Sequence, residues 1–266
     1  MREADSDPHE FVRLFASHYC TIADFKAIKE LMDSLGHQGV VPCPLCSNIT
    51  KDGRWGTLPL TNLQCGRWEP HSDQSVRDIV NELKERKGTL KKGAFTALET
   101  RKGFHYHEMS ITLDSDCKTV STLQYDWPHV CFIGGIFSAE LTAFMDLARQ
   151  ITPPNRKACV TFDDLHVYLQ QWRRPSKLRS CANIFEKGRL SATASEQLTA
   201  APVVRKYFED VVIREPSMGP LHEAARSMAL CCGAIELLQC ASRQLITPAQ
   251  LHDGIVHHLQ KHQEVY

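Results

Sequence analysis

The chain has 266 residues, with 42% hydrophobic and 23% charged side chains, a composition typical of a globular protein with a substantial core. Its 31 basic and 31 acidic residues cancel, so the overall charge excludes a uniformly basic nucleic-acid-binding protein. No run of about 18 apolar residues predicts a membrane span, and the acidic start MREADSDPHEF does not resemble a signal peptide. The 11 cysteines are an odd number, which favours thiols or metal ligands in a reducing, intracellular compartment over a disulfide framework.

The N-terminal half is expected to alternate helices with extended segments. Apolar residues at helical spacing predict one helix in TIADFKAIKELMDSLG and another in SDQSVRDIVNELKERKG, which ends at Gly88. Two short strands joined by the polar turn TRKG are predicted within Ala94–Leu113. Further extended segments are expected near Lys118–Tyr125 and His129–Phe137.

The C-terminal half is expected to be mainly helical. SAELTAFMDLARQI forms a helix that ends at TPP, and TFDDLHVYLQQWRR forms another, with Thr161 and Asp164 close to a capping box. From about residue 195 every segment has helical spacing. These elements predict an α+β fold: a central antiparallel sheet flanked by helices, with a zinc-knuckle insertion and a helical C-terminal part. A composition shift near residue 192 predicts two domains, 1–192 and 193–266, with the zinc-binding segment at 43–71.

Four potential zinc ligands lie in the turn-rich segment after the first helix. Cys43 and Cys46 are separated by two residues in a knuckle-like turn, and Cys65 and His71 follow. Three thiolates and one imidazole can close a four-coordinate site, which would be structural because it leaves no open position. The alternative is a set of free, buried thiols.

The predicted hairpin carries a second potential metal site. His105 and His107 are two apart, so on a strand they would point to the same face, and Glu99 on the preceding strand would lie opposite them. Two imidazoles and one carboxylate suit Mg²⁺ or Mn²⁺ with open positions for a phosphate oxygen. The alternative is a pair of ordinary histidines at the edge of the core.

The stretch RDIVNELKERKGTLKKGAFTALETRKGFHYHEMSITL resembles the HUH endonucleases, most closely the parvovirus-type replication initiators. His105-Tyr106-His107 fits the histidine–hydrophobic–histidine motif of that family, and Glu99 fits its third metal ligand. The resemblance covers about residues 73–179. It implies a metal-dependent nickase in which a helical tyrosine attacks the scissile phosphate and becomes linked to the 5′ end. The chain has no GxxxxGK[ST] motif, so a helicase domain like that of the initiators is not expected within it.

Tyr168 is the candidate nucleophile that the resemblance implies. It lies in a predicted helix, with Gln171 on the same face as a catalytic partner. The family usually has Lys or Gln at the fourth position after the tyrosine, where this chain has Trp172. Tyr207 is the rival nucleophile. The alternative for Tyr168 is an aromatic residue at the edge of the core.

Two basic segments could hold DNA phosphates, a role that is independent of sequence. Residues 84–102 contain seven Lys or Arg and two Glu, and residues 173–189 contain six and one, so each has a local charge of +5. The alternative is that both are merely solvated faces. The proposed DNA contacts are Lys91, Lys92, Arg101, Lys102, Arg173, Arg174, Lys177 and Arg179.

Two functions from different classes follow. The first is a single-strand DNA endonuclease that nicks a replication origin or hairpin through a covalent 5′-phosphotyrosine, with Mg or Mn at the catalytic site and structural Zn. The second is a non-enzymatic zinc-binding viral accessory or regulatory protein that acts through protein or nucleic-acid contacts. A viral origin would place either one in the nucleus. The C-terminal helices are candidates for self-association or for binding a protein partner, and no membrane partner is expected.

Overall fold

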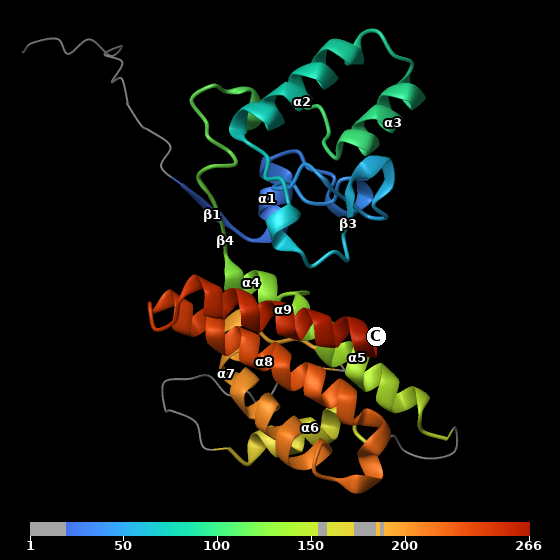
Figure 1. Cartoon of the computed structure of the whole chain (residues 1–266), viewed down its shortest axis with the longest axis vertical. Coiled ribbons are helices and arrows are strands. Elements are labelled where there is room, and N and C mark those ends of the chain that lie inside the picture. Colours follow the sequence, from blue (N-terminus) through green and yellow to red (C-terminus); the bar gives the residue numbers. More distant parts are fainter. Residues whose placement is uncertain (1–19, 154–158, 173–184, 187–188) are drawn as a thin grey trace, which may run out of the picture. The chain divides into compact units, whose positions relative to one another are not determined.

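A computed structural model describes residues 20–153, 159–172, 185–186 and 189–266 (Figure 1). The chain forms two compact units, which are described separately. The first unit comprises Met1–Leu60 and Trp68–Gln124, and the second comprises Thr61–Arg67 and Tyr125–Tyr266. The division between Gln124 and Tyr125 differs from the boundary near residue 192 that the composition predicted.

The described residues of the first unit form three helices joined by long irregular segments and very short strands. The β2–β3 pair is parallel, with Ile49 opposite Leu58, and β1 pairs with β4. A short 3₁₀ turn, Ile111–Leu113, packs against α2. The elements are β1 (Thr21–Ala23), α1 (Phe25–Leu31), β2 (Ile49–Thr50), β3 (Leu58–Pro59), α2 (Asp73–Lys87), α3 (Lys92–Lys102) and β4 (Leu123–Tyr125).

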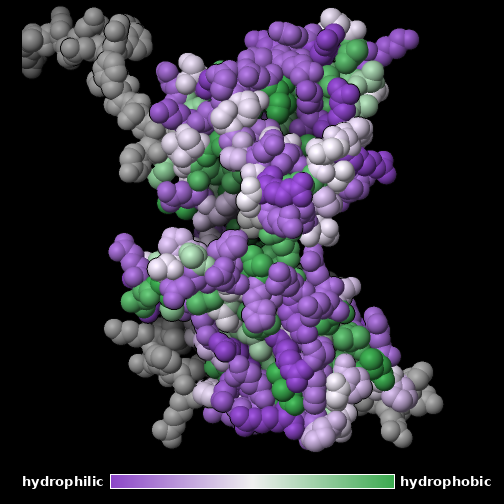
Figure 2. Space-filling view, viewed as in Figure 1, coloured by the Kyte–Doolittle hydropathy of each residue, from purple (hydrophilic) through white to green (hydrophobic). Residues whose placement is uncertain are grey.

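Helix α2 confirms the sequence prediction for this segment. Ser72 caps its first turn, because the Ser72 hydroxyl accepts the Ser75 backbone N–H and the Ser75 hydroxyl accepts the Ser72 N–H. Val76, Val80 and Leu83 form a fully buried stripe along one side of the helix. The opposite side is exposed and mainly hydrophilic (Figure 2).

The predicted hairpin at Ala94–Leu113 is wrong. Residues 92–102 form α3, and Gly103 ends that helix in the left-handed conformation, with φ of +80°. A side chain at Gly103 would also place its Cβ 2.5 Å from the Val41 carbonyl oxygen. The TRKG sequence is therefore the end of a helix rather than a strand-to-strand turn.

The fold class changes accordingly. The described residues are mainly helical, and their strands are only two or three residues long. The segment at His129–Phe137, predicted to be extended, is divided between two helices, whereas part of Lys118–Tyr125 is extended as β4. An α+β fold around a central antiparallel sheet is thus contradicted, because the strand pairs in the described residues form no common sheet.

The second unit is a helical bundle around α8, which packs against α5, α7 and α9. Its only described strands, β5 and β6, form a two-residue antiparallel pair. A π-helical turn, Phe208–Val212, continues α7, and a 3₁₀ segment, Pro216–Leu221, leads into α8. The elements are α4 (Trp127–Phe132), α5 (Ile136–Gln150), α6 (Phe162–Gln170), β5 (Phe185–Glu186), β6 (Arg189–Leu190), α7 (Ala194–Tyr207), α8 (His222–Ser242) and α9 (Pro248–Val265).

Two stretches of this unit, Trp127–Gln150 and Pro216–Ser242, have the length and apolar composition of a membrane-spanning helix. Core helices of globular proteins share these properties. Here the apolar side chains of both stretches contribute to one core, in which Phe144 and Phe208 pack edge to face with ring centres 4.6 Å apart.

Candidate functional site

Backbone pairing brings the cysteine turn and His71 to adjacent segments of the chain. The Ser47 N–H donates to the Glu69 carbonyl and the His71 N–H donates to the Leu45 carbonyl, each at 2.8 Å. Cys46 and Pro70 form an antiparallel bridge between these two hydrogen bonds. Residues 45–47 and 69–71 therefore lie side by side, immediately before the Ser72 cap of α2.

A hydrogen bond between the side chains of Cys43 and Cys46 shifts the pKa values of both thiols. The hydrogen bond from Cys46 lowers the pKa of Cys43 to about 6, although burial opposes this shift. The same bond, together with burial, raises the pKa of Cys46 above its ordinary value. The shift favours a thiolate on Cys43 that its neighbouring thiol stabilises. Thiolates are the form of cysteine that binds metals.

The hydrogen bonds of His71 determine which of its nitrogens is free. Its Nδ1 lies 3.0 Å from the Ser75 hydroxyl oxygen, which accepts the Ser72 N–H and donates its only proton to the Ser72 carbonyl. With the Ser75 proton directed to the Ser72 carbonyl, Nδ1 carries the imidazole proton and donates it to Ser75. Nε2 is then an unprotonated acceptor, and it is buried without a hydrogen-bond partner in the described structure.

His71 thus has the form that a metal ligand requires. Its side chain is only 8% exposed, and burial lowers the pKa of its imidazole, so the ring is neutral at physiological pH. An Nδ1–H held by a neighbouring oxygen, with Nε2 free, is the usual arrangement of a histidine that binds metal through Nε2. The Phe104 ring packs edge-on against it, with centroids 6.0 Å apart.

The fourth zinc ligand that the sequence predicts is Cys65. Cys65 begins the 3₁₀ turn Cys65–Arg67, but its side chain is not among the described ones. Among the residues that the structure describes, no three His, Cys, Asp or Glu side chains are arranged as a formed metal-binding group. The Cys43, Cys46, Cys65 and His71 site therefore stays a prediction.

The structure brings together two of the three residues proposed for the catalytic metal. Glu99 is buried on α3, accepts the Tyr106 backbone N–H at 2.9 Å and lies 3.4 Å from His105 Nδ1. His107 instead accepts the Met109 N–H within its own loop. The chain after Gly103 is not a strand, so His105 and His107 do not share a strand face.

The candidate nucleophiles belong to the second unit and pack around its core. Tyr168 is half-buried, with its ring 5.1 Å from that of Tyr207 and 6.1 Å from that of Trp172. Tyr207 is 4% exposed, and burial raises the pKa of its phenol, which opposes its use as a nucleophile. Gln171 is exposed and forms the C-cap of α6. This arrangement fits the alternative of aromatic residues at the edge of the core.

The first basic segment forms an exposed surface on α2, α3 and their connection. Two of its lysines are paired, Lys102 with Glu82 at 2.6 Å and Lys87 with Glu108 at 3.1 Å. The other cations of this segment are exposed and make no ion pair in the described structure: Lys84, Arg86, Lys91, Lys92 and Arg101. We call these five side chains the basic hairpin, because they lie on the helical hairpin formed by α2, α3 and their connection and not on the predicted β-hairpin. The second basic segment, with Arg173, Arg174, Lys177 and Arg179, lies outside the described residues.

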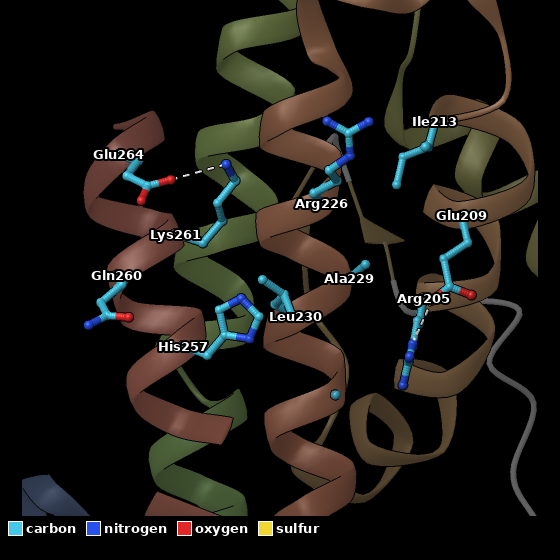
Figure 3. A pocket seen from close by; sticks show the side chains of 11 residues that line it. Arg205, Glu209, Ile213, Arg226, Ala229, Leu230, His257, Gln260, Lys261 and Glu264 are labelled. Atoms are coloured by element: carbon cyan, nitrogen blue, oxygen red, sulfur yellow. Dashed lines mark hydrogen bonds and ion pairs between the residues drawn. The ribbon is translucent and has the colours of Figure 1, made fainter. Parts of the chain in front are cut away.

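A groove in the second unit was not foreseen from the sequence. It has a volume of about 510 Å³, and its floor is formed by Ala229 and Leu230 of α8 (Figure 3). The cations that line it are each held in ion pairs, for example Arg205 with Glu209 at 2.8 Å. Its residues come from three successive helices, α7 with its π-helical continuation, α8 and α9, and meet only when these helices pack, so no local motif could have revealed it.

No family model, curated protein or solved structure matches this chain. Its function has to be argued from the residues and geometry described above.

Proposed function

We propose that this protein is a non-enzymatic, zinc-stabilised module that binds nucleic acid through the basic hairpin. The observation that carries the proposal is the group of five exposed cations without ion pairs on α2, α3 and the connection between them. Cations that are not neutralised by the protein itself are available to replace the counterions of a phosphate backbone. The partner class that fits this surface is a nucleic acid, recognised by its charge rather than by its sequence.

The surface of residues 84–102 stays positively charged even though Lys87 and Lys102 pair with Glu108 and Glu82. Residues 84–102 carry seven basic and two acidic side chains, and one of the two acids, Glu99, is buried and bonded to the Tyr106 backbone. Only Glu85 remains as an exposed acid within this segment. A chain with zero overall charge thus concentrates positive charge on one surface, as an electrostatic binding site requires.

Zinc has a structural role in this proposal. His71 directly precedes the Ser72 cap of α2, so a zinc ion held by Cys43, Cys46 and His71 would fix the cysteine turn to the start of that helix. The first unit has only short strands and a small set of buried apolar side chains, and small domains of this kind commonly depend on a metal or disulfide.

The nuclease hypothesis depended on a β-hairpin at Ala94–Leu113, and the structure has helix α3 in the first part of that segment. A divalent ion at Glu99, His105 and His107 would need His107 to turn away from its own loop, where its Nδ1 accepts the Met109 N–H. Attack by Tyr168 now has only the sequence motif in its favour. The non-enzymatic alternative requires no such rearrangement.

The proposal is tested by measuring binding to single-stranded DNA, double-stranded DNA and RNA. The variant Lys91→Gln/Lys92→Gln/Arg101→Gln removes three charges of the basic hairpin. The control Lys26→Gln/Arg149→Gln/Arg243→Gln removes three exposed charges elsewhere. We expect affinity to fall in the first variant and to persist in the control. Equal affinities for the two variants would show that the basic hairpin is only a solvated face.

A further inference from the structure

The second unit contains a buried cluster that the proposed function does not use. Glu140 of α5 is fully buried, and its Oε2 lies 2.5 Å from His262 Nδ1 and 3.5 Å from His258 Nε2. These three atoms are all buried, and beyond their contacts with one another none has a hydrogen-bond partner in the described structure. Three potential ligand atoms therefore face one another in the interior.

The fold places this cluster through three helices. His258 and His262 are four residues apart on α9, so they lie on the same helical face, and their ring centroids are 6.2 Å apart. The Ser227 hydroxyl of α8 donates to the other oxygen of Glu140 at 2.5 Å, which fixes the orientation of the carboxylate. An oriented carboxylate opposite two imidazoles is the ligand set of many zinc centres.

We propose that Glu140, His258 and His262 form a metal site that binds Zn²⁺ or a similar transition-metal ion. Imidazole nitrogens favour such ions over Mg²⁺ and Ca²⁺, which prefer oxygen ligands. Three protein ligands would leave a fourth position for water or another group. This site is separate from the cysteine turn of the first unit and does not depend on the function proposed above.

In the described structure these three side chains are not arranged as a formed metal-binding group. The spacing of the ligand atoms fits this proposal after one adjustment. Bonds of 2.0–2.2 Å in a tetrahedral site place ligand atoms about 3.3 Å apart. The separation of 3.5 Å between His258 and Glu140 already suits such a site. His262 Nδ1 is too close to Glu140 and has to move outward by about 0.8 Å. Its side chain is 38% exposed and lies in the last turn of α9, so it has room to move.

The competing explanation is a simple ion pair between Glu140 and a protonated His262. That arrangement leaves His258 Nε2 buried, at 1% side-chain exposure, without a hydrogen bond. Native proteins seldom leave a buried polar atom unsatisfied. A metal ion would instead take a lone pair from each of the three residues and would connect α9 to α5.

The test uses the full chain carrying Cys43→Ser/Cys46→Ser, so that the first site cannot contribute. Zn²⁺ alone is the probe, with stoichiometry measured by elemental analysis and affinity by competition with a chelator. We expect one Zn²⁺ per chain. We expect His258→Gln/His262→Gln to abolish its binding, and His257→Gln, which alters an exposed neighbour on α9, to retain it. Co²⁺ bound to this chain should lack the near-ultraviolet charge-transfer band of thiolate ligation.

Unchanged Zn²⁺ binding in His258→Gln/His262→Gln would overturn the proposal, as would the absence of bound Zn²⁺ in the chain that retains both histidines. If the double variant does not fold, the single variant His262→Gln replaces a partly exposed side chain and serves instead. It should fold, as judged by circular dichroism, and bind Zn²⁺ more than about 10-fold more weakly, since even outer-shell changes have effects of that size. Equal affinity in this variant would also refute the site. Loss of zinc from the cysteine turn alone would affect only the function proposed above.

Discussion

Nδ1 of His71 lies 3.0 Å from the Ser75 hydroxyl, and Nε2 of the same ring is buried without a hydrogen-bond partner in the described structure. When Ser75 donates its own proton to the Ser72 carbonyl, it accepts the Nδ1 proton of His71. One serine thereby joins two roles, completing the cap of α2 and selecting the metal-binding tautomer of the residue before it.

The first prediction concerns this contact. Ser75→Ala should weaken zinc binding to the first unit by about 10- to 100-fold, because the imidazole loses the acceptor that fixes its tautomer. Chelator competition measures the change. Ser72→Ala is the matched control, since it removes the helix cap without removing the acceptor of His71. A similar loss of zinc affinity in both variants would show that capping, and not tautomer selection, is the role of Ser75.

The second prediction concerns removal of the metal itself. Cys43→Ser/Cys46→Ser should lose one zinc per chain by elemental analysis, and the first unit should melt at a lower temperature because metal binding is coupled to folding. A loss of about 2 kcal/mol would lower the midpoint of a unit of this size by about 10 °C. Cys231→Ser/Cys232→Ser, in the core of the second unit, is the control and should retain that zinc. An unchanged zinc content in the first variant would contradict the site.

The third prediction is a pH dependence that arises from Asp73. Burial acts to raise the pKa of Asp73, but the Ser121 side chain, the backbone N–H groups of Val120 and Ser121 and the charge of Arg77 outweigh it and hold the pKa below its ordinary value. A depressed pKa stabilises the folded state above the unfolded pKa of about 3.9, and this stability is lost as pH falls through the lower folded value.

Asp73→Asn should therefore lower the free energy of unfolding at pH 6, with a smaller difference from the wild type near pH 3. Urea unfolding curves measured between these two pH values test this. Asp78→Asn, on an exposed part of α2, is the control and should change the pH dependence less. A constant difference between Asp73→Asn and the wild type at every pH would show that the ionisation of Asp73 does not contribute.

The fourth prediction tests the end of α3. Gly103→Ala should destabilise the first unit by more than about 1 kcal/mol, because the residue has a positive φ and its new Cβ would clash with the Val41 carbonyl. Gly88→Ala is the matched control at the end of α2, where φ is −84° and no atom lies within 4 Å of the new Cβ. That variant should be neutral or slightly stabilising, as measured by urea unfolding. Equal effects would argue against the helix end at Gly103.

The fifth prediction separates binding from catalysis. On our account the wild-type chain forms no denaturation-resistant adduct with single-stranded DNA in the presence of Mg²⁺ or Mn²⁺, because His107 Nδ1 is engaged with the Met109 N–H of its own loop. Denaturing gel electrophoresis with labelled DNA is the measurement. An adduct that disappears in Tyr168→Phe would establish the nickase hypothesis, and one that persists would direct attention to Tyr207.

Local signals in the sequence predicted the elements that depend on local interactions. Apolar residues at helical spacing in SDQSVRDIVNELKERKG and the glycine at position 88 predicted α2, and the structure confirms that helix. Thr161 and Asp164 likewise form the predicted capping box at the start of α6. Each of these features involves residues within a few positions of one another.

The same reading failed where two local signals competed. GAFTALETRKG contains Ala, Leu, Glu and Lys, which favour helices, but the two histidines after Gly103 suggested a strand and its turn. A glycine at position 103 fits either a hairpin turn or a helix end. In the structure it ends a helix and packs closely against the Val41 backbone, a contact that the sequence does not reveal. The cluster of Glu140, His258 and His262 was missed because its members meet only through the packing of α5 and α9.

The most direct test of the central claim is the salt dependence of binding to a single-stranded oligonucleotide, followed by fluorescence anisotropy. Binding through phosphate contacts predicts a linear fall of log K with log salt, and Lys91→Gln/Lys92→Gln/Arg101→Gln should reduce the slope by about 2, since each contact contributes about 0.7. The control Lys26→Gln/Arg149→Gln/Arg243→Gln should keep the wild-type slope. The same slope in all three proteins, or no binding at low salt, would contradict the assignment of the basic hairpin as a nucleic-acid interface.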